Sequence, residues 1–250
     1  MNDIEVNYHF LDVDRRFDYY DQHRNAFQRL FGIYLRSEPG LGGRVLDIGC
    51  GHGLNRSYKF FSDLVGQLDG VDPFPAVAPP EQMVNRWTCD LEDIPVPPCT
   101  YDLAYSYMVA EHIEHIRPFL STLMKILKPG AAYWSISPNA AHPFTWATRL
   151  VQGLGLKRYY RKYRGTQSIN DYPAYYRLSS DTRILSALKT MRLPVSRVDY
   201  YYLPNVQWDM AFPAGLRWIA HVLDRNALLR NPKRANIFIF RLEKSPLADP

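Results

Sequence analysis

The spacing of apolar residues changes along the chain, and the first change comes near residue 40. Between Phe17 and Tyr34 apolar positions recur three and four residues apart, and Ser37-Glu38-Pro39-Gly40 interrupts the pattern. Such spacing is typical of an amphipathic helix, and proline and glycine together are typical of a helix end. We therefore predict that residues 1–40 form a cap of one or two helices.

From Gly43 onward, short apolar runs alternate with turns and with amphipathic segments. The runs predict strands at Arg44–Ile48, Gln67–Val71, Val84–Thr88, Tyr101–Tyr105 and Ala131–Ser137. The amphipathic segments predict helices at Leu54–Asp63 and Pro118–Leu127. Strands that alternate with helices are typical of a parallel sheet that is covered on both faces.

The alternation stops after Ser137. Residues 139–178 are aromatic, basic and interrupted by prolines, which predicts an insertion. The rest of the chain predicts a helix at Ser179–Met191, a strand at Arg197–Leu203, a short helix near Leu216 and a last strand at Asn236–Leu242. We expect one α/β domain over residues 1–250, with its core at 43–138, the insertion at 139–178, and C-terminal helices and last strands at 179–250.

Composition limits the class of protein. The chain has 250 residues, of which 46% are hydrophobic and 22% charged, so disorder is excluded as its main state. It holds no apolar run long enough to predict a membrane-spanning helix. Its start lacks the pattern of a secretory signal, and its three cysteines lack metal-binding spacing. We therefore expect a cytoplasmic protein with reduced thiols.

The net charge of +5 is unevenly distributed. Residues 115–170 contain nine bases and no acid, so the remaining residues carry a net charge of −4, from 21 bases and 25 acids. A basic middle region on a mildly acidic body concerns the partners of the protein more than its fold.

The sharpest motif is the glycine-rich turn that follows the first predicted strand of the core. Gly49, Gly51 and Gly53 alternate there, and Asp47 lies inside the strand just before them. Glycine lets the chain turn tightly and lets a ligand approach the main chain. The spacing differs from the Gly-x-Gly-x-x-Gly pattern of dinucleotide sites. Because Asp47 would repel a pyrophosphate, the turn favours a ligand with a cationic amino group.

Further landmarks follow in order. They are Gly70-Val71-Asp72-Pro73, Thr88-Cys89-Asp90-Leu91-Glu92-Asp93-Ile94-Pro95, Tyr101–Ser106, Ala110-Glu111-His112-Ile113 and Leu127-Lys128-Pro129-Gly130. Together with the glycine turn, they resemble the motifs of class I S-adenosylmethionine-dependent methyltransferases over residues 43–140. The resemblance implies a Rossmann-like methyltransferase fold: a mostly parallel seven-stranded sheet with helices on both faces, plus an inserted helical and aromatic lid.

The resemblance also implies a cofactor site for S-adenosylmethionine and its product S-adenosylhomocysteine. In it, Asp72 would accept the ribose hydroxyls, Asp90 would take the adenine amine, and Leu91 would offer its backbone N–H. The full set of expected cofactor-binding residues is Asp47, Gly49, Cys50, Gly51, Gly53, Asp72, Pro73, Phe74, Asp90, Leu91 and Ser106.

Histidines supply the candidates for catalysis. A hydroxyl acceptor must lose its proton, and His112, His142 or His115 could take it near neutral pH. The alternative for His112 is that it only holds its loop. The metal-dependent small-RNA methyltransferases use a Glu-x-x-Glu-His run, but Met108 stands at its first acid position here, so we expect no metal site.

The basic aromatic stretch 144–164 has three possible uses: a lid over the acceptor, contact with an anionic membrane surface, or RNA binding. We favour the lid together with peripheral membrane contact, since the layout resembles that of the ubiquinone-type O-methyltransferases. The predicted function is methyl transfer to a small or lipid-like acceptor, with a hydroxyl preferred. The alternatives are an RNA methyltransferase and a non-catalytic scaffold. Nucleic acid is the less favoured partner because Ser137-Pro138-Asn139-Ala140 replaces the Asn/Asp-Pro-Pro-aromatic run of amino-methylating enzymes.

Overall fold

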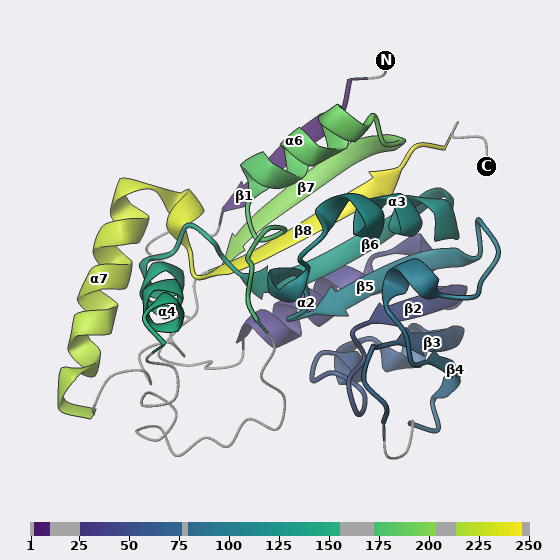
Figure 1. Ribbon diagram of the computed structural model, residues 1–250, viewed down its shortest axis with the longest axis horizontal. Helices are drawn as coiled ribbons and strands as arrows, with labels where there is room; N and C mark the ends of the chain where they lie inside the picture. The colour runs from purple at the N-terminus through teal and green to yellow at the C-terminus, as the bar shows by residue number, and fades with distance from the viewer. Residues whose placement is uncertain (1–2, 11–25, 77–79, 156–172, 204–213, 247–250) are drawn as a thin grey trace.

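The computed structural model describes residues 3–10, 26–76, 80–155, 173–203 and 214–246. One eight-stranded sheet runs through it in the order β1-β7-β8-β6-β5-β2-β3-β4 (Figure 1). The strands are β1 Glu5–Phe10, β2 Arg44–Ile48, β3 Gln67–Val71, β4 Met83–Trp87, β5 Tyr101–Tyr107, β6 Leu127–Pro138, β7 Val195–Leu203 and β8 Ile237–Lys244. Neighbours are parallel except where β8 pairs with β6 and β7. The predicted Rossmann-like, mostly parallel architecture is confirmed.

Helices cover both faces of this sheet. Helix α2, Ala26–Arg36, lies on one face, and helices α3, Ile116–Ile126, and α6, Asp181–Met191, lie on the other (Figure 1). Successive strand residues point to opposite faces, so Val45 and Leu46 belong to two different hydrophobic clusters. Each cluster is fully buried at its centre, which fixes both layers of helices against the sheet.

The N-terminal prediction needs a correction. Residues 5–10 form strand β1, which pairs in parallel with β7, so the sheet has eight strands and not seven. The apolar residues Val6, Tyr8 and Phe10 alternate, which is the period of a strand. Tyr8 stacks on Tyr200 at 5.5 Å between ring centroids, so the strand is held by its side chains as well as its ladder. Of the predicted helical cap, α2 is present, and residues 11–25 lie outside the described residues.

The helix predicted at Leu54–Asp63 is also wrong. Two short 3₁₀ turns, Tyr58–Phe60 and Ser62–Leu64, stand in its place. The Asn55 side chain accepts a hydrogen bond from the Ser57 backbone N–H at 2.9 Å. A side chain that bonds its own backbone two residues on competes with helix formation. The glycine turn is therefore followed by irregular chain and not by a helix N-terminus.

The C-terminal half is close to prediction. Helix α6 and strands β7 and β8 lie within two residues of their expected bounds. Helix α4, Pro143–Gly153, occupies the start of the insertion, and α7, Arg217–Arg230, is longer than expected. Residues 156–172 of the insertion lie outside the described residues. Among the helices that the structure describes, none is both long and apolar enough to cross a membrane.

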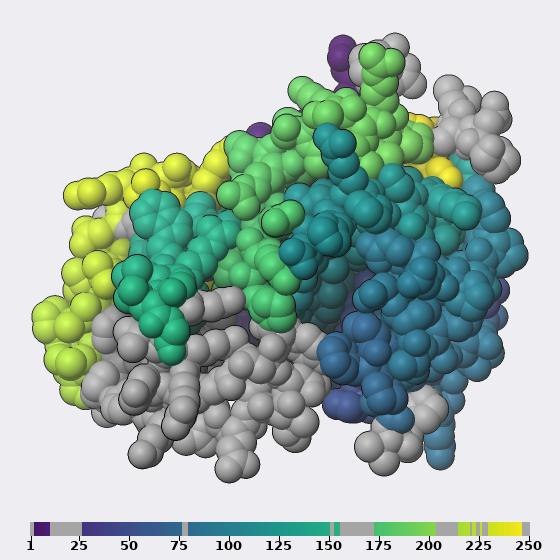
Figure 2. Space-filling model, viewed as in Figure 1, coloured from purple at the N-terminus to yellow at the C-terminus, as the bar shows by residue number. Residues whose placement is uncertain are grey.

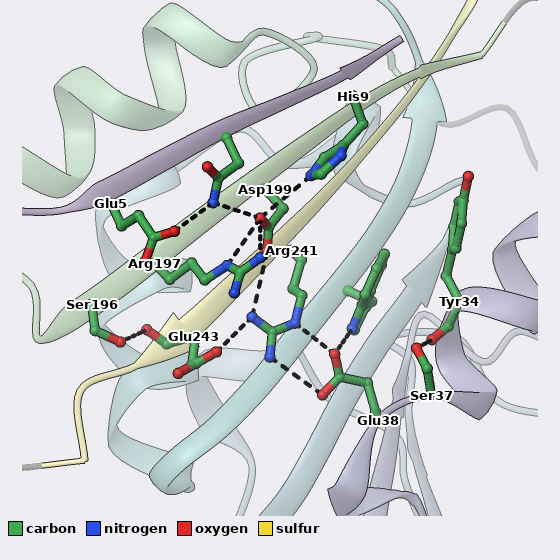
Figure 3. Close-up of polar contacts among 12 residues, drawn as sticks. Glu5, His9, Tyr34, Ser37, Glu38, Ser196, Arg197, Asp199, Arg241 and Glu243 are labelled. Carbon is green, nitrogen blue, oxygen red and sulfur yellow. Dashed lines mark hydrogen bonds and ion pairs between the residues drawn. The ribbon is translucent and has the colours of Figure 1, made fainter. Parts of the chain in front are cut away.

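A buried charge network joins α2 to the last two strands (Figure 3). Arg241 on β8 donates to Glu38, just after α2, and to Glu243, and its Nη1 lies 3.5 Å from Asp199 Oδ2 on β7. The Arg197 Nε donates to Asp199 Oδ1 at 3.0 Å. These residues come from distant parts of the sequence, so the network links the chain just after α2 to strands β7 and β8 inside the sheet.

Candidate active site

A cavity of about 310 Å³ opens where β2 and β3 end and beside the chain that follows β4 and β5. In open α/β sheets, ligands bind at this carboxyl edge of the strands. The lining residues are Ile48, Gly49, Gly51, Val71, Asp72, Pro73, Phe74, Cys89, Asp90, Leu91, Glu92, Tyr107, Met108, Val109, His112, Ile113 and Phe119. Eight of the predicted site residues are among them, so the structure brings these distant motifs together at one cavity.

The glycine turn needs its glycines at two positions. Gly49 has a φ of +74° and Gly51 a φ of +60°, a region that residues with a side chain rarely adopt. A Cβ atom on Gly49 would lie 2.3 Å from Val109 Cγ2, so the turn also packs directly on the far wall of the cavity. The close packing keeps the turn narrow and exposes its backbone to the cavity.

Asp72 lies at the end of β3 and holds this turn. Its Oδ2 accepts from the Gly51 backbone N–H at 2.8 Å, and its Oδ1 accepts from the Phe74 N–H at 2.9 Å. A carboxylate offers about four acceptor positions, so both oxygens keep capacity for ligand hydroxyls. Asp72 is therefore rigidly placed by the backbone on each side of it.

Arg86 is a site residue that sequence reasoning missed. Its guanidinium donates to the backbone oxygens of Gly51, at 3.1 Å, and of Phe74. It thereby ties the glycine turn to the loop after β3, from a position on β4. A single arginine in a weak strand gives no sequence signal for such a role.

Four predicted cofactor residues lie away from the cavity. Asp47 is fully buried beneath the turn, Cys50 is buried in the core, and Ser106 shares hydrogen bonds with Tyr133 and Ser135. Gly53 follows the turn without lining the cavity. Burial raises the pKa of the Cys50 thiol to about 12, so this cysteine is no nucleophile.

Asp47 is unusual because it is fully buried, yet hydrogen bonds satisfy only one of its two carboxylate oxygens. Its Oδ2 accepts from the Tyr105 hydroxyl at 2.9 Å and from the Asn55 Nδ2 at 3.2 Å. Its Oδ1 has no hydrogen-bond partner among the described residues. Burial raises the pKa of this carboxyl to about 7. Asp47 thus lies behind the turn as a buried acid with one free oxygen.

His112 forms part of the opposite wall of the cavity, and the buried residue Glu111 precedes it. His112 lines the cavity, with its Nδ1 2.9 Å from the Pro173 carbonyl oxygen and its Nε2 3.9 Å from Glu111 Oε1. The Glu111 backbone oxygen accepts from the N–H groups of Tyr175 and Tyr176, at 2.7 and 2.9 Å. This wall is therefore fastened to the end of the insertion.

The Glu111 side chain is a second buried acid. Its Oε2 has no partner within the described part of the chain, and burial raises its pKa to about 8. Burial, and to a smaller extent the charge of Glu111, raises the pKa of Tyr107, Tyr133 and Tyr176. Its place next to His112 could be read from the sequence, but its burial could not.

The other two candidate bases lie elsewhere. His142 is fully buried, and its Nδ1 accepts from the Phe144 backbone N–H at 3.0 Å. His115 is exposed just before α3. The structure places both outside the cavity lining, so His112 is the histidine that faces it. Among the described residues, no cluster of histidine, cysteine and acidic side chains is suited to hold a metal ion.

Comparison with known proteins now defines the class. The family model of the methyltransferase domain matches residues 19–188, about two thirds of the chain. The chain therefore belongs to the methyltransferase domain family, and the resemblance deduced from its motifs is confirmed at this level.

Individual relatives are more distant. A protein of Mycolicibacterium smegmatis described as a probable S-adenosylmethionine-dependent methyltransferase is 27% identical over 118 residues. The match covers 45% of each chain, so it spans less than half the length of that relative.

Solved structures share the fold at low identity. A chain of the Haloferax volcanii complex between the Trm112 methyltransferase activator and a methyltransferase has a TM-score of 0.56 at 14% identity, covering 93% of this chain and 94% of that one. A Haemonchus contortus phosphoethanolamine N-methyltransferase has a TM-score of 0.52 at 16% identity, covering 88% of this chain and 52% of that one.

Proposed function

We propose that this protein transfers the methyl group of S-adenosylmethionine to a small or lipid-like acceptor, with a hydroxyl as the receiving group. The observation that carries the proposal is the cavity itself. It presents Asp72 beside a narrow glycine turn on one side and Asp90 with Leu91 on another. Methyltransferase family membership supports the same activity.

The residues present fit the cofactor. Asp72 keeps free acceptor capacity for ribose hydroxyls, and Asp90 and Leu91 lie where an adenine ring would meet them. The glycine turn leaves its backbone open to a ligand at Gly51, where an added Cβ atom would meet nothing within 4 Å. Asp47 lies next to the turn with one free buried oxygen, and its hydrogen-bond partners are Tyr105 and Asn55, so it would act on the cofactor from outside the cavity.

The chemistry divides between cofactor and protein. When bound, the cofactor supplies an activated methyl group, so the protein has to align the acceptor and remove its proton. If the Nδ1–H of neutral His112 donates to the Pro173 carbonyl, the basic lone pair lies on Nε2. His112 would then take the hydroxyl proton at Nε2, with Glu111 beside it.

The ubiquinone-type assignment and membrane contact belong to this proposal as well. In α4, Trp146 and Leu150 lie four residues apart and are 62% and 64% exposed, and Leu154 continues the stripe. An exposed apolar stripe on a helix, in a basic stretch of sequence, suits the surface of a membrane that carries a lipid-like acceptor. The basic residues 157–164 of that stretch lie outside the described residues.

Titration calorimetry with S-adenosylhomocysteine tests the donor site. We expect micromolar binding, and at least about tenfold weaker binding by Asp72→Asn, because the amide loses the charge that favours two ligand hydroxyls. Asp93→Asn is the matched control, since Asp93 is exposed and outside the cavity lining. Absence of binding by the wild-type protein would favour the scaffold alternative.

Screening of methyl acceptors tests the second part of the proposal, which is the transfer of the methyl group to a hydroxyl. Transfer of radioactive methyl groups to a panel of phenols and long-chain alcohols should be detectable, and His112→Gln should abolish most of it while leaving cofactor affinity unchanged. Methylation of RNA but of no alcohol would overturn the acceptor class.

A further inference from the structure

A second hollow lies beside the active-site cavity, between helices α3 and α6. These helices are neighbours on one face of the sheet and run in the same direction (Figure 1). Their atoms lie next to each other on the face of the molecule that Figure 2 shows. The groove between them has a volume of about 470 Å³. It begins near the cavity, because Ile113 lines the cavity and Ile116, three residues later at the start of α3, lines the groove.

The face of α6 toward this groove is polar. Thr182, Ser186 and Thr190 follow each other at intervals of four residues, and Arg183 adjoins the first. The opposite face of the same helix buries Ile184 and Leu188 against the sheet. A helix that packed on α3 would present apolar residues there instead. Hydroxyl groups therefore line the groove over about 12 Å, at 1.5 Å per residue.

Three arginines give the groove its charge. Arg117 comes from the first turn of α3, Arg183 from the first turn of α6, and Arg177 from the chain before α6. Arg177 lies over the Tyr175 ring, and Arg183 donates to the Tyr176 backbone oxygen. Within the described ranges, no carboxylate forms an ion pair with any of the three.

The nearby acids are already engaged. The Asp181 carboxylate pairs with Lys233 at 2.8 Å and accepts from the Thr182 backbone N–H at 2.7 Å. Glu114 is exposed, and its carboxylate raises the pKa of the Tyr175 hydroxyl. Both helices also begin at this end of the groove, so their dipoles add positive potential to that of the guanidiniums.

We propose that this groove binds a phosphate-bearing ligand, best a diphosphate. Guanidiniums bind phosphate oxygens through paired, charge-assisted hydrogen bonds, and the threonine and serine hydroxyls can donate to the same oxygens. A phosphate monoester carries a charge of only about −1.5 to −2. Three guanidiniums therefore match a diphosphate more closely than a single phosphate or a carboxylate.

A ligand bound in the groove would also affect the cavity wall that contains His112. Arg177 follows directly on Tyr175 and Tyr176, whose N–H groups bond the Glu111 backbone oxygen. A ligand bound by Arg177 would thus restrain residues 175–177, two of which are hydrogen-bonded to the Glu111 backbone next to His112. The binding proposal rests on the groove alone and does not depend on methyl transfer.

Titration calorimetry with inorganic pyrophosphate, at low ionic strength where screening is weak, tests the proposal. The double variant Arg117→Gln/Arg183→Gln should bind at least about tenfold more weakly than the wild-type protein, since it loses two charge-assisted contacts. The control Lys125→Gln/Lys189→Gln removes two charges from the same helices outside the groove, and it should change affinity by less than about twofold. Thermal unfolding verifies that both variants fold.

Two results would overturn the proposal. One is absence of pyrophosphate binding by the wild-type protein together with no groove-dependent binding to vesicles. The other is an equal loss in both double variants, which would mean that net charge alone attracts the anion.

Vesicles of phosphatidylcholine with phosphatidic acid distinguish the source of the phosphate. If the groove variant also loses vesicle binding, and pyrophosphate competes with the vesicles, the ligand is a lipid headgroup. If the groove variant loses pyrophosphate binding but binds vesicles as the wild type does, the ligand is a soluble phosphate compound. S-adenosylhomocysteine binding is measured separately, so failure of the donor site would be distinguishable from failure of the groove.

Discussion

Buried carboxyl groups occur in two regions of the molecule, and the two regions treat them differently. In the network of Figure 3, Glu38 and Asp199 are buried with Arg241 between them, and each accepts further hydrogen bonds, such as that from Trp134 Nε1 to Glu38 at 2.8 Å. Beside the cavity, Asp47 and Glu111 are as deeply buried, but within the described residues neither pairs with a lysine or an arginine, and Glu111 Oε1 lies only within 3.9 Å of His112 Nε2.

The difference separates groups that hold the fold from groups that serve a ligand. A buried charge without a counterion is costly, and proteins tolerate such groups mainly at functional sites. The pKa of Asp47 and that of Glu111 are raised by burial, to about 7 and about 8, which is the consequence of leaving them unpaired. In the network, in contrast, burial alone would lower the pKa of the Arg241 guanidinium, but the carboxylates of Glu38 and Glu243 outweigh it and raise that pKa.

The strongest test of this comparison removes the cation from the paired region. Arg241→Met should lower the free energy of unfolding by about 3–5 kcal/mol, because it leaves Glu38 and Asp199 buried without their shared partner. Urea denaturation measures the change. The double variant Glu38→Gln/Arg241→Met should recover part of the loss, and a loss below about 1 kcal/mol for Arg241→Met would show that the network is not structurally important.

Beside the cavity, removing the carboxylate of Glu111 should raise the free energy of unfolding and not lower it. The folded-state pKa of Glu111 lies above its unfolded value of 4.5, so its contribution to stability is fully present below about pH 4.5 and is lost as pH rises to about 8. Glu111→Gln abolishes this loss. Its advantage in unfolding free energy over the wild type should therefore grow by roughly 2–4 kcal/mol between pH 5 and pH 8.5. An advantage independent of pH would contradict the raised pKa.

Asp47→Asn should show the same sign over a lower pH range, together with a functional cost. The pKa of Asp47 is raised from 3.8 to about 7, so the stability advantage of the variant should grow between about pH 4 and pH 7. The amide keeps an acceptor for Tyr105 and Asn55 but places N–H groups where the free oxygen stood. We expect about tenfold weaker S-adenosylhomocysteine binding, or about 1.4 kcal/mol. A variant that is more stable and binds equally well would remove Asp47 from the site.

The sequence predicted one of these two regions much better than the other. Strands β2 and β3 were predicted to the residue because each is a short run between turn signals that ends just before glycine or aspartate, and parallel strands bring their carboxyl ends to one edge. Asp72 and Asp90, which follow β3 and β4, both line the cavity at this edge, and their role in cofactor binding stays a prediction. The Glu38–Arg241 pair spans 203 residues of sequence, so no local pattern could reveal it. Likewise the alternation in β1 is too short to outweigh the helical spacing that follows it.

The smallest predicted effect tests whether burial, and not charge pairing alone, makes the network strong. The Arg197 side chain pairs with Asp199 at 3.0 Å but is 42% exposed, whereas that of Arg241 is 13% exposed. Exposed pairs contribute little because water screens them, so Arg197→Gln should cost less than about 1 kcal/mol in urea denaturation. Asp199 would still accept from Asn7 at 3.1 Å and lie near Arg241. A loss as large as that of Arg241→Met would mean that Asp199 depends on both cations equally, and burial would no longer explain why the two regions differ.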